Sequence, residues 1–496
     1  MRKVRAFCGF EGCVDSETEF LTKHGWKKIK DYEGEEVGVY TSEGFLKFEV
    51  PSRFIKEKAT TWIELKSNHG IDQKISEGHR IFYITSKGRL YNKTAIEVYN
   101  NHQSSASGFT GKFIASFKND SKKELPISDG LLRLYVAFQA DGSKLKFKNS
   151  VTFNLKKERK KERLEKLLKE EGIEFTYTDG KEENTNFGYR TYRFQLEGCF
   201  KIFPREWWEL SNRQLMIIAE EVLFWDGSWN MFLKRGTKAY FSNYKENADF
   251  IQFVFSCLGM RANIKKDYHR KRINYGVYGT KRNLLVLHPN KNSAIKYPAN
   301  EKEYKYCFTT STGMWISRRN DNIIITGNSG KDYSVQRLIA TMGFKRIAFA
   351  DILRDMAFHT LGMNYKEGMQ KYEELKQTKL INDLNFRNIL ENMGSAVRKY
   401  DEDFFAKAVT KFIGSCVEDV AISDLRYPNE YWVVKDYCGK NKIDFKLVFC
   451  DYHSEKYRTD NPHESAKFAG YLKGLGYRDQ EFVDEEDIVQ YDGGRA

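Results

Sequence analysis

The two halves of a phosphate-binding loop lie 316 residues apart in this 496-residue chain. The tetrapeptide Ser329-Gly330-Lys331-Asp332 matches the end of the pattern G-x-x-x-x-G-K-[ST], but the first glycine of that pattern would fall at Ile325, inside an apolar stretch. When residues 13–328 are removed, Gly9-Phe10-Glu11-Gly12 joins the tetrapeptide and restores the spacing. The sequence therefore indicates one loop interrupted by an insert.

The segments outside the insert have the context that the loop requires. Residues 4–8 are apolar enough for a short buried strand before the glycines, and residues 333–342 are helix-like after them. Joined, residues 1–12 and 329–496 contain 180 residues, a suitable size for one α/β domain with a parallel sheet.

The cysteines and the hydropathy pattern limit the kind of protein. The eight cysteines are scattered without a C-x-x-C pair, which is typical of a reduced intracellular protein, and we expect a cytoplasmic location in a phage or bacterial host. No run of eighteen apolar residues predicts a membrane span, so no membrane partner is expected.

The positive charge is confined to the insert. The whole chain carries 82 Lys and Arg against 68 Asp and Glu, a net charge of +14, whereas residues 13–328 alone have a net charge of +15. Residues 251–300 contain ten basic residues and one acidic residue, Asp267. A concentration of this kind favours a polyanion as the partner.

The residues at the two edges of the insert carry the chemistry needed to remove it. A thiol at Cys13 can attack the preceding carbonyl and convert the Gly12–Cys13 amide to a thioester. The hydroxyl of Ser329 can then accept the acyl chain, and Asn328 can cyclise onto its own carbonyl to release the insert.

Two segments of the insert, and a third that extends to Ser329, resemble the splicing blocks of an intein with a Hint splicing domain, which implies an all-β fold. These segments are CVDSETEFLTKHGWKKIKDY, IDQKISEGHRIFY and YKYCFTTSTGMWISRRNDNIIITGNS. The resemblance implies catalytic roles for Cys13, Ser76, His79, Asn328 and Ser329, with His79 as the acid for the leaving nitrogen and with no cofactor. Two positions depart from the family pattern: Gly327 replaces the usual penultimate histidine, and Cys307 replaces a frequent aspartate.

The centre of the insert contains an internal repeat. LLRLYVAFQADGS and LMIIAEEVLFWDGSW are apolar helix-like runs that end in Asp-Gly-Ser at Asp141 and Asp226. Each is followed by a polar strand-like stretch, a second helix and a glycine turn, at Gly172 and Gly259. Similar offsets at several features predict two duplicated units with approximate twofold symmetry.

This repeat resembles the LAGLIDADG homing endonucleases, an α+β fold, over about residues 125–295. The resemblance implies duplex DNA as the partner and Mg²⁺ bound by the catalytic residues Asp141 and Asp226. Val136 and Glu221 stand where small residues usually let the two helices pack closely. Basic residues that follow each Asp-Gly-Ser would line the DNA groove: Lys144, Lys146, Lys148, Lys234, Arg235 and Lys238.

The joined ends resemble the phage-type deoxynucleoside monophosphate kinases, because Asp332 replaces the usual Ser or Thr after Lys331. The resemblance implies ATP and Mg²⁺ as cosubstrates and a deoxynucleoside monophosphate as acceptor. The expected ATP-binding residues are Gly9, Gly12, Gly330, Lys331 and Asp332. The expected substrate-binding residues, from the segments RIAFADILRDMA, NMGSAVRKYDEDFFAKAV and VAISDLRYPNE, are Asp351, Arg354, Arg398, Asp424 and Arg426.

These patterns predict a multi-domain chain in five segments. They are host residues 1–12, splicing residues 13–124, endonuclease residues 125–295, splicing residues 296–328 and host residues 329–496. Excision of residues 13–328 would leave an active kinase and a free homing endonuclease. The alternative is an unspliced or slowly splicing P-loop kinase of other small-molecule specificity with a DNA-binding but catalytically dead insert.

Overall fold

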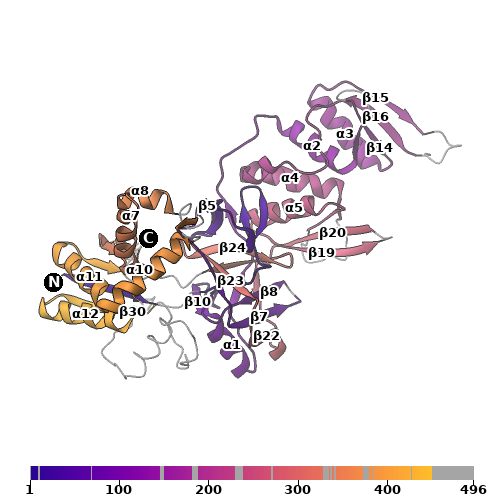
Figure 1. Ribbon diagram of the computed structural model, residues 1–496. Coiled ribbons are helices and arrows are strands. Elements are labelled where there is room, and N and C mark those ends of the chain that lie inside the picture. The colour runs from indigo at the N-terminus through magenta and orange to yellow at the C-terminus, as the bar shows by residue number, and fades with distance from the viewer. Residues whose placement is uncertain are drawn as a thin grey trace. The chain divides into compact units, whose positions relative to one another are not determined.

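The chain is a multi-domain α/β protein with mixed sheets. The computed structural model describes residues 2–8, 12–68, 70–145, 150–180, 188–228, 238–269, 272–327, 335, 338–339, 342–372, 379–381, 384–425 and 427–449. It divides into two compact units, Met1–Gly12 with Ser329–Ala496 and Cys13–Asn328, whose elements are shown in Figure 1.

The unit formed by the two ends of the chain is built on a parallel sheet in the order β26-β29-β1-β30. The N-terminal strand β1 lies inside this sheet, between two strands from the C-terminal third of the chain. Val4, Ile422 and Leu447 are buried in its apolar core. Its strands are β1 (Lys3–Cys8), β26 (Lys345–Ile347), β27 (Lys379–Ile381), β28 (Leu384–Asn385), β29 (Val420–Ile422) and β30 (Asp444–Phe449). Its helices include α7 (Phe349–Thr360), α8 (Tyr365–Gln370), α10 (Phe386–Tyr400), α11 (Phe404–Ser415) and α12 (Pro428–Lys440).

The unit Cys13–Asn328 begins and ends with short β-strands. A first group precedes residue 120: β2 (Glu19–Thr22), β3 (Gly25–Lys28), β4 (Val37–Tyr40), β5 (Phe45–Glu49), β6 (Arg53–Lys58), β7 (Thr61–Ser67), β8 (Ile71–Ile75), β9 (Arg80–Ile84), β10 (Leu90–Thr94), β11 (Lys112–Ile114) and β12 (Lys118–Asn119). A second group closes the unit: β21 (Leu284–Val286), β22 (Ala294–Pro298), β23 (Tyr304–Thr309), β24 (Met314–Arg319) and β25 (Asn322–Gly327). The groups interleave, because β11 pairs with β21, β7 with β22 and β6 with β23.

One helix, α1 (Ala95–Ser104), accompanies these strands. Thr94 caps its first turn, and the Glu97 carboxylate accepts a hydrogen bond from the Thr94 backbone N–H at 2.7 Å, which completes a capping box.

The centre of this unit contains the repeat expected from the sequence. The first half consists of α2 (Asp129–Asp141), β13 (Gly142–Lys144), β14 (Ser150–Leu155), α3 (Glu158–Glu170), β15 (Phe175–Asp179) and β16 (Arg190–Gln195). The second half consists of α4 (Asn212–Trp225), β17 (Gly227–Ser228), β18 (Lys238–Ser242), α5 (Lys245–Cys257), β19 (Arg261–His269) and β20 (Arg272–Thr280). The strand orders are equivalent, β13-β14-β16-β15 and β17-β18-β20-β19.

Equivalent local signals build the equivalent helices. Ser128 and Ser211 cap the first turns of α2 and α4 through their hydroxyl oxygens. Gly172 and Gly259 follow the ends of α3 and α5 with φ of 64° and 75°, a left-handed conformation in which a side chain would be strained.

The two halves differ in what lies beside them. The sheet of the first half is separate, whereas β19 of the second half also pairs with β25, with Asn263 opposite Asn322. The second half and the flanking β-strands thus share one sheet.

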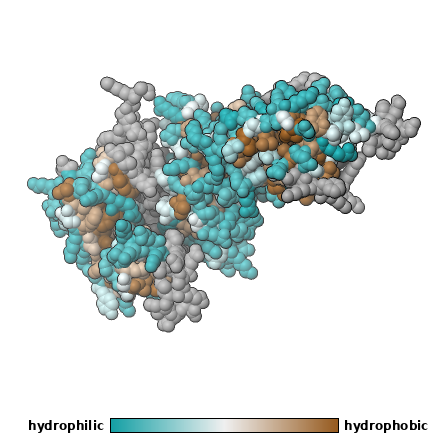
Figure 2. Space-filling model, turned by 90° about the horizontal axis from the view of Figure 1, so that it is seen from above, coloured by the Kyte–Doolittle hydropathy of each residue, from teal (hydrophilic) through white to brown (hydrophobic). Residues whose placement is uncertain are grey.

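In the space-filling view, hydrophilic side chains cover most of the coloured surface and apolar ones gather in separate areas (Figure 2).

Candidate functional site

Cys13 lies at the start of its unit, in the interior. Its side chain is fully buried, and both its backbone N–H and its backbone carbonyl form hydrogen bonds with Ser76. The Cys13 N–H, which belongs to the Gly12–Cys13 peptide, donates to the Ser76 hydroxyl at 2.9 Å. The Ser76 N–H donates to the Cys13 carbonyl, also at 2.9 Å. Ser76 is thus in direct contact with the amide that the sequence predicts to be cleaved.

His79 follows in the same loop and contacts the opposite end of the unit. Its side chain is fully buried, and its N–H donates to the Ser76 carbonyl at 3.0 Å. Its Nε2 hydrogen-bonds the hydroxyl of Thr326 in β25. Thr326 and Gly327 pair with Ile81 and Arg80 at the start of β9. The loop 76–80 therefore contacts residues at both edges of the unit.

Gly327 is fixed by its surroundings. A Cβ atom placed on it would overlap the carbonyl oxygen of Gly313 and the ring of Phe82. Because the ring of Phe82 and the Gly313 carbonyl already fill this space, the structure leaves no room for a side chain at position 327.

Cys307 lies next to the predicted nucleophile. Cys13, Ile55 and Cys307 form one small buried apolar cluster, and Cys307 lies opposite Ile55 in the β6–β23 pair. The bridge between Val14 and Tyr306, with N–H···O distances of 2.8 and 2.9 Å, holds the two cysteine-bearing segments side by side.

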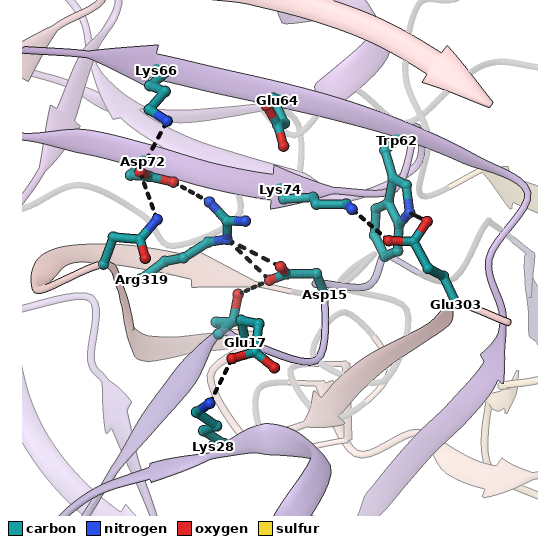
Figure 3. Close-up of polar contacts among 12 residues, drawn as sticks. Asp15, Glu17, Lys28, Trp62, Glu64, Lys66, Asp72, Lys74, Glu303 and Arg319 are labelled. Carbon is teal, nitrogen blue, oxygen red and sulfur yellow. Dashed lines mark hydrogen bonds and ion pairs between the residues drawn. The ribbon is translucent and has the colours of Figure 1, made fainter. Parts of the chain in front are cut away.

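An ionic cluster that sequence reasoning missed is formed by Asp15, Asp72 and Arg319 (Figure 3). Arg319, at the end of β24, pairs with Asp15 at 3.1 Å and with Asp72. Asp15 follows Cys13 by two residues, and Asp72 lies on β8, which leads to Ser76. Burial raises the pKa of the Asp15 carboxyl, while the Arg319 charge acts in the opposite direction. The paired residues are 304 and 247 positions apart in the sequence, so no local sequence pattern identifies these pairs.

Several predicted site residues lie outside the described part of the chain. They are Gly9, Asn328, Ser329, Gly330, Lys331, Asp332 and Arg426. The predicted groove residues Lys146, Lys148, Lys234 and Arg235 also lie outside it.

A second site lies where helices α2 and α4 end. Asp141 is the last residue of α2, and Asp226 directly follows α4. Burial, and then the Asp141 charge, raise the pKa of Asp226 to about 6. Glycines at 142 and 227 are required, because a Cβ at either position would overlap the preceding helical turn. The structure therefore brings the two repeated carboxylates together.

Two lysines accompany the carboxylates. Lys160 of α3 forms an ion pair with Asp141. The Nζ of Lys201 donates to the carbonyls of Phe138 and Gln139 at 2.9 and 3.0 Å. Burial lowers the pKa of Lys201, and the two aspartates act against that shift. Neither lysine was identified as a site residue from the sequence.

The interface between α2 and α4 departs from close packing of small residues. Val136 is fully buried there, and Glu221 is 1% exposed. The Glu221 carboxylate accepts from Arg133 at 2.9 Å, from Arg163 at 2.6 Å and from the indole of Trp225 at 2.8 Å. A buried carboxylate with these three donors joins helices α2, α3 and α4.

Predicted substrate residues of the other unit meet at the start of α7. The Asp424 carboxylate accepts from the N–H groups of Phe349 and Ala350 at 2.8 and 3.0 Å. Asp351 pairs with Arg354 at 2.7 Å. Asp424 therefore anchors the positive end of the helix.

Arg398 occupies a different environment. Its guanidinium lies over the rings of Phe405 and Tyr427, at 5.0 and 4.5 Å from their centroids.

Among the residues that the structure describes, no three His, Cys, Asp or Glu side chains group closely enough to hold a metal ion by themselves. None of their helices is both long and apolar enough to cross a membrane.

No protein-family model matches the chain, and no curated protein matches its sequence. Similar solved structures include the N-terminal LAGLIDADG domain of DUF199/WhiA, with 11% identity over 37% of this chain and 82% of that one, at a TM-score of 0.25. A variant of I-DmoI in complex with its target DNA in the presence of Mg shares 15% identity over 31% of this chain and 90% of that one, at a TM-score of 0.23. Full-length DUF199/WhiA from Thermatoga maritima shares 11% identity over 32% of this chain and 53% of that one, at a TM-score of 0.24.

Proposed function

We propose that this chain is a self-splicing precursor, in which the intein formed by residues 13–328 is excised and Gly12 is ligated to Ser329. One observation carries the proposal: the loop 76–80 bonds to Cys13 at one edge of the unit and to Thr326 and Gly327 at the other. Splicing requires chemistry at both edges, and a single loop that contacts both is suited to coordinate them.

The first step uses the residues around Cys13. Its thiol attacks the Gly12 carbonyl carbon, so a C–S bond forms and the Gly12–Cys13 C–N bond breaks. The nitrogen leaves as an amine, which requires a proton from an acid such as His79. Ser76, which bonds the same N–H at 2.9 Å, orients the amide for this step.

The later steps use the other edge. The Ser329 hydroxyl attacks the thioester, which releases the Cys13 thiol and leaves the N-terminal segment as an ester. The Asn328 side-chain nitrogen then attacks its own carbonyl carbon, closes a succinimide and breaks the Asn328–Ser329 bond. The freed Ser329 amine finally displaces the ester oxygen, and a Gly12–Ser329 peptide bond results.

Single substitutions test this sequence of steps. Cys13→Ala should prevent ligation and cleavage at Gly12 but still permit release at Asn328. Asn328→Ala should prevent release at Ser329 but still permit thiol-induced cleavage at Gly12. Electrophoresis of the purified chains separates the products, and a ligated product from Cys13→Ala would contradict the thioester route.

We propose that the spliced 180-residue product is a P-loop deoxynucleoside monophosphate kinase. The position of β1 inside a parallel sheet whose other strands all follow residue 328 supports a host domain interrupted after its first strand. Gly9, Gly12, Gly330 and Lys331 would hold the ATP phosphates, and Asp332 would alter the Mg²⁺ contact that the usual Ser or Thr makes. A panel of nucleoside monophosphate acceptors would separate this activity from another small-molecule kinase.

We propose that the excised intein is also a DNA endonuclease. The carboxylates of Asp141 and Asp226, whose mutual repulsion helps raise the pKa of Asp226, would together hold a divalent cation. Mg²⁺ held there would stabilise negative charge on the phosphodiester oxygens. Exposed Lys144 and half-buried Lys238 extend the positive surface beside them.

The competing hypothesis for the intein is a module that binds DNA without cutting it. A duplex that spans the uninterrupted codons for Gly12 and Ser329 should be cut in Mg²⁺ by the 316-residue product. Asp141→Asn should abolish cutting and retain salt-sensitive binding. Binding without cutting by the unmodified product would favour the inactive module.

A further inference from the structure

The hairpin of β24 and β25, which leads to residue 327, packs against helix α5 of the second half-repeat. Arg318, 2% exposed at the end of β24, pairs with Asp249 of α5 and with Glu19 of β2 at 2.7 Å. Lys245, at the start of α5, pairs with Asp321 in the hairpin turn at 2.8 Å. The helix therefore contacts both the strand and the turn.

Gln252 is the centre of this contact. Its side chain is fully buried, and its Nε2 donates to the carbonyls of Asp321 at 2.7 Å and Ala262 at 2.9 Å. Its Oε1 accepts from Arg318 at 3.1 Å. Asn320 and Asp321 have φ of 46° and 64°, the left-handed region that Asn and Asp tolerate better than other residues with a side chain, and Gln252 holds the Asp321 carbonyl within this turn.

The hairpin and the second half-repeat also share a sheet and a core. Asn263 of β19 lies opposite Asn322, the first residue of β25, and donates to its side chain at 3.0 Å. Ile316, Ile323 and Ile325 of the hairpin belong to the same apolar core as side chains of α4 and α5. Displacement of α5 would therefore be transmitted to the strand that ends beside Asn328.

We infer that Gln252 is a positioning residue for cleavage at Asn328, so that part of the endonuclease region is an integral component of the splicing machinery. This inference rests on the proposed splicing function. Asn328 cyclisation depends on backbone orientation, and β25 receives that orientation from its turn at Asp321 as well as from β9. The chemistry at Cys13 depends more directly on Ser76, which bonds the Gly12–Cys13 N–H, and is linked to β25 through the His79–Thr326 hydrogen bond, so it should respond less to Gln252.

The test compares Gln252→Met with Gln214→Met, a matched control. Gln214 is also fully buried in the repeat, on α4, and bonds the backbone of Leu125 at 2.9 and 3.2 Å. Each variant is placed in a Cys13→Ala chain to measure cleavage at Asn328 and in an Asn328→Ala chain to measure dithiothreitol-induced cleavage at Gly12. Melting temperatures of both variants are recorded alongside.

The expected result is that Gln252→Met slows cleavage at Asn328 about tenfold, because the buried Asp321 carbonyl loses its donor. Cleavage at Gly12 should stay within about twofold, and Gln214→Met should change neither rate by more than about twofold. Equal slowing of both steps by Gln252→Met, equal effects of the two substitutions, or no slowing at all would overturn the inference. Absence of cleavage at Asn328 in the Cys13→Ala parent would instead contradict splicing itself.

Discussion

Asp226 is a carboxyl group in an environment that disfavours its charge. Burial and the neighbouring Asp141 raise its pKa to about 6, above the ordinary aspartate value of about 3.9. The folded state therefore binds a proton on Asp226 more tightly than the unfolded state, so the contribution of this group to stability is most favourable below about pH 4 and falls as the pH rises to about 6. Above about pH 6 the carboxylate is ionised in both states, and the full cost of burying its charge opposes folding.

Asp226→Asn should therefore stabilise the 316-residue product by up to about 3 kcal/mol at pH 7.5 and by little at pH 4. Urea unfolding at the two pH values measures the difference. Asp267→Asn, at an exposed site, is the control and should change stability little. A gain of the same size at both pH values would show that the charge of Asp226 is not the cause.

Individual residues differ in how far the sequence could identify them. Asp141 and Asp226 were found because each ends a similar apolar run in Asp-Gly-Ser. Thr326, Arg319 and Lys201 were missed, because their partners lie 62 to 304 residues away and only the fold brings them together. The sequence shows a glycine at position 327, where the splicing blocks it resembles usually have a histidine. That Phe82 and Gly313 leave no room for a side chain there could be seen only in the structure.

Helices α2 and α4 are joined by the buried carboxylate of Glu221. Arg133, Arg163 and Trp225 all donate to it, so its removal would leave two partly buried guanidinium groups without their partner. Glu220 is the natural control, because it pairs with the same Arg133 at 3.0 Å but is 57% exposed.

Glu221→Ala should destabilise the 316-residue product by about 3 kcal/mol, as expected for a broken buried ion pair. Glu220→Ala should cost less than about 1 kcal/mol, as expected for an exposed pair. Chemical unfolding of the two variants provides the comparison. Similar losses for both would mean that burial of Glu221 does not decide its contribution.

At the level of elements, the sequence predicted the repeat because apolar runs that end in Asp-Gly-Ser recur, each followed by a glycine turn. It could not predict how the repeat is attached. The pairing of β19 with β25 brings together Asn263 and Asn322, and no local pattern specifies that contact. The predicted boundaries at residues 124 and 295 remain predictions; β22, which pairs with β7, begins at Ala294.

For the whole chain, the division into Cys13–Asn328 and the joined ends has a consequence for phosphoryl transfer. The proposed loop would be one continuous set of backbone donors only after Gly12 is joined to Ser329. Because phosphoryl transfer depends on positioned donors, the unspliced chain should be a very poor kinase.

This expectation can be measured with a precursor that carries Cys13→Ala and Asn328→Ala. Its ATP-dependent phosphorylation of deoxynucleoside monophosphates should be far below that of the spliced product. Lys331→Ala in the spliced product should also abolish activity, which controls for a contaminating kinase. Equal turnover by precursor and product would refute control of the kinase by splicing.

The ligated junction itself can be detected directly. Trypsin cleaves after Arg5 and Lys331, so ligation of Gly12 to Ser329 creates the peptide AFCGFEGSGK, which is absent from the unspliced sequence. Tandem mass spectrometry of the freshly expressed wild-type chain should detect this peptide, and the Cys13→Ala, Asn328→Ala chain should lack it. If the wild-type chain yields only peptides that continue from Gly12 into Cys13, residues 13–328 are not excised and the proposed function is wrong.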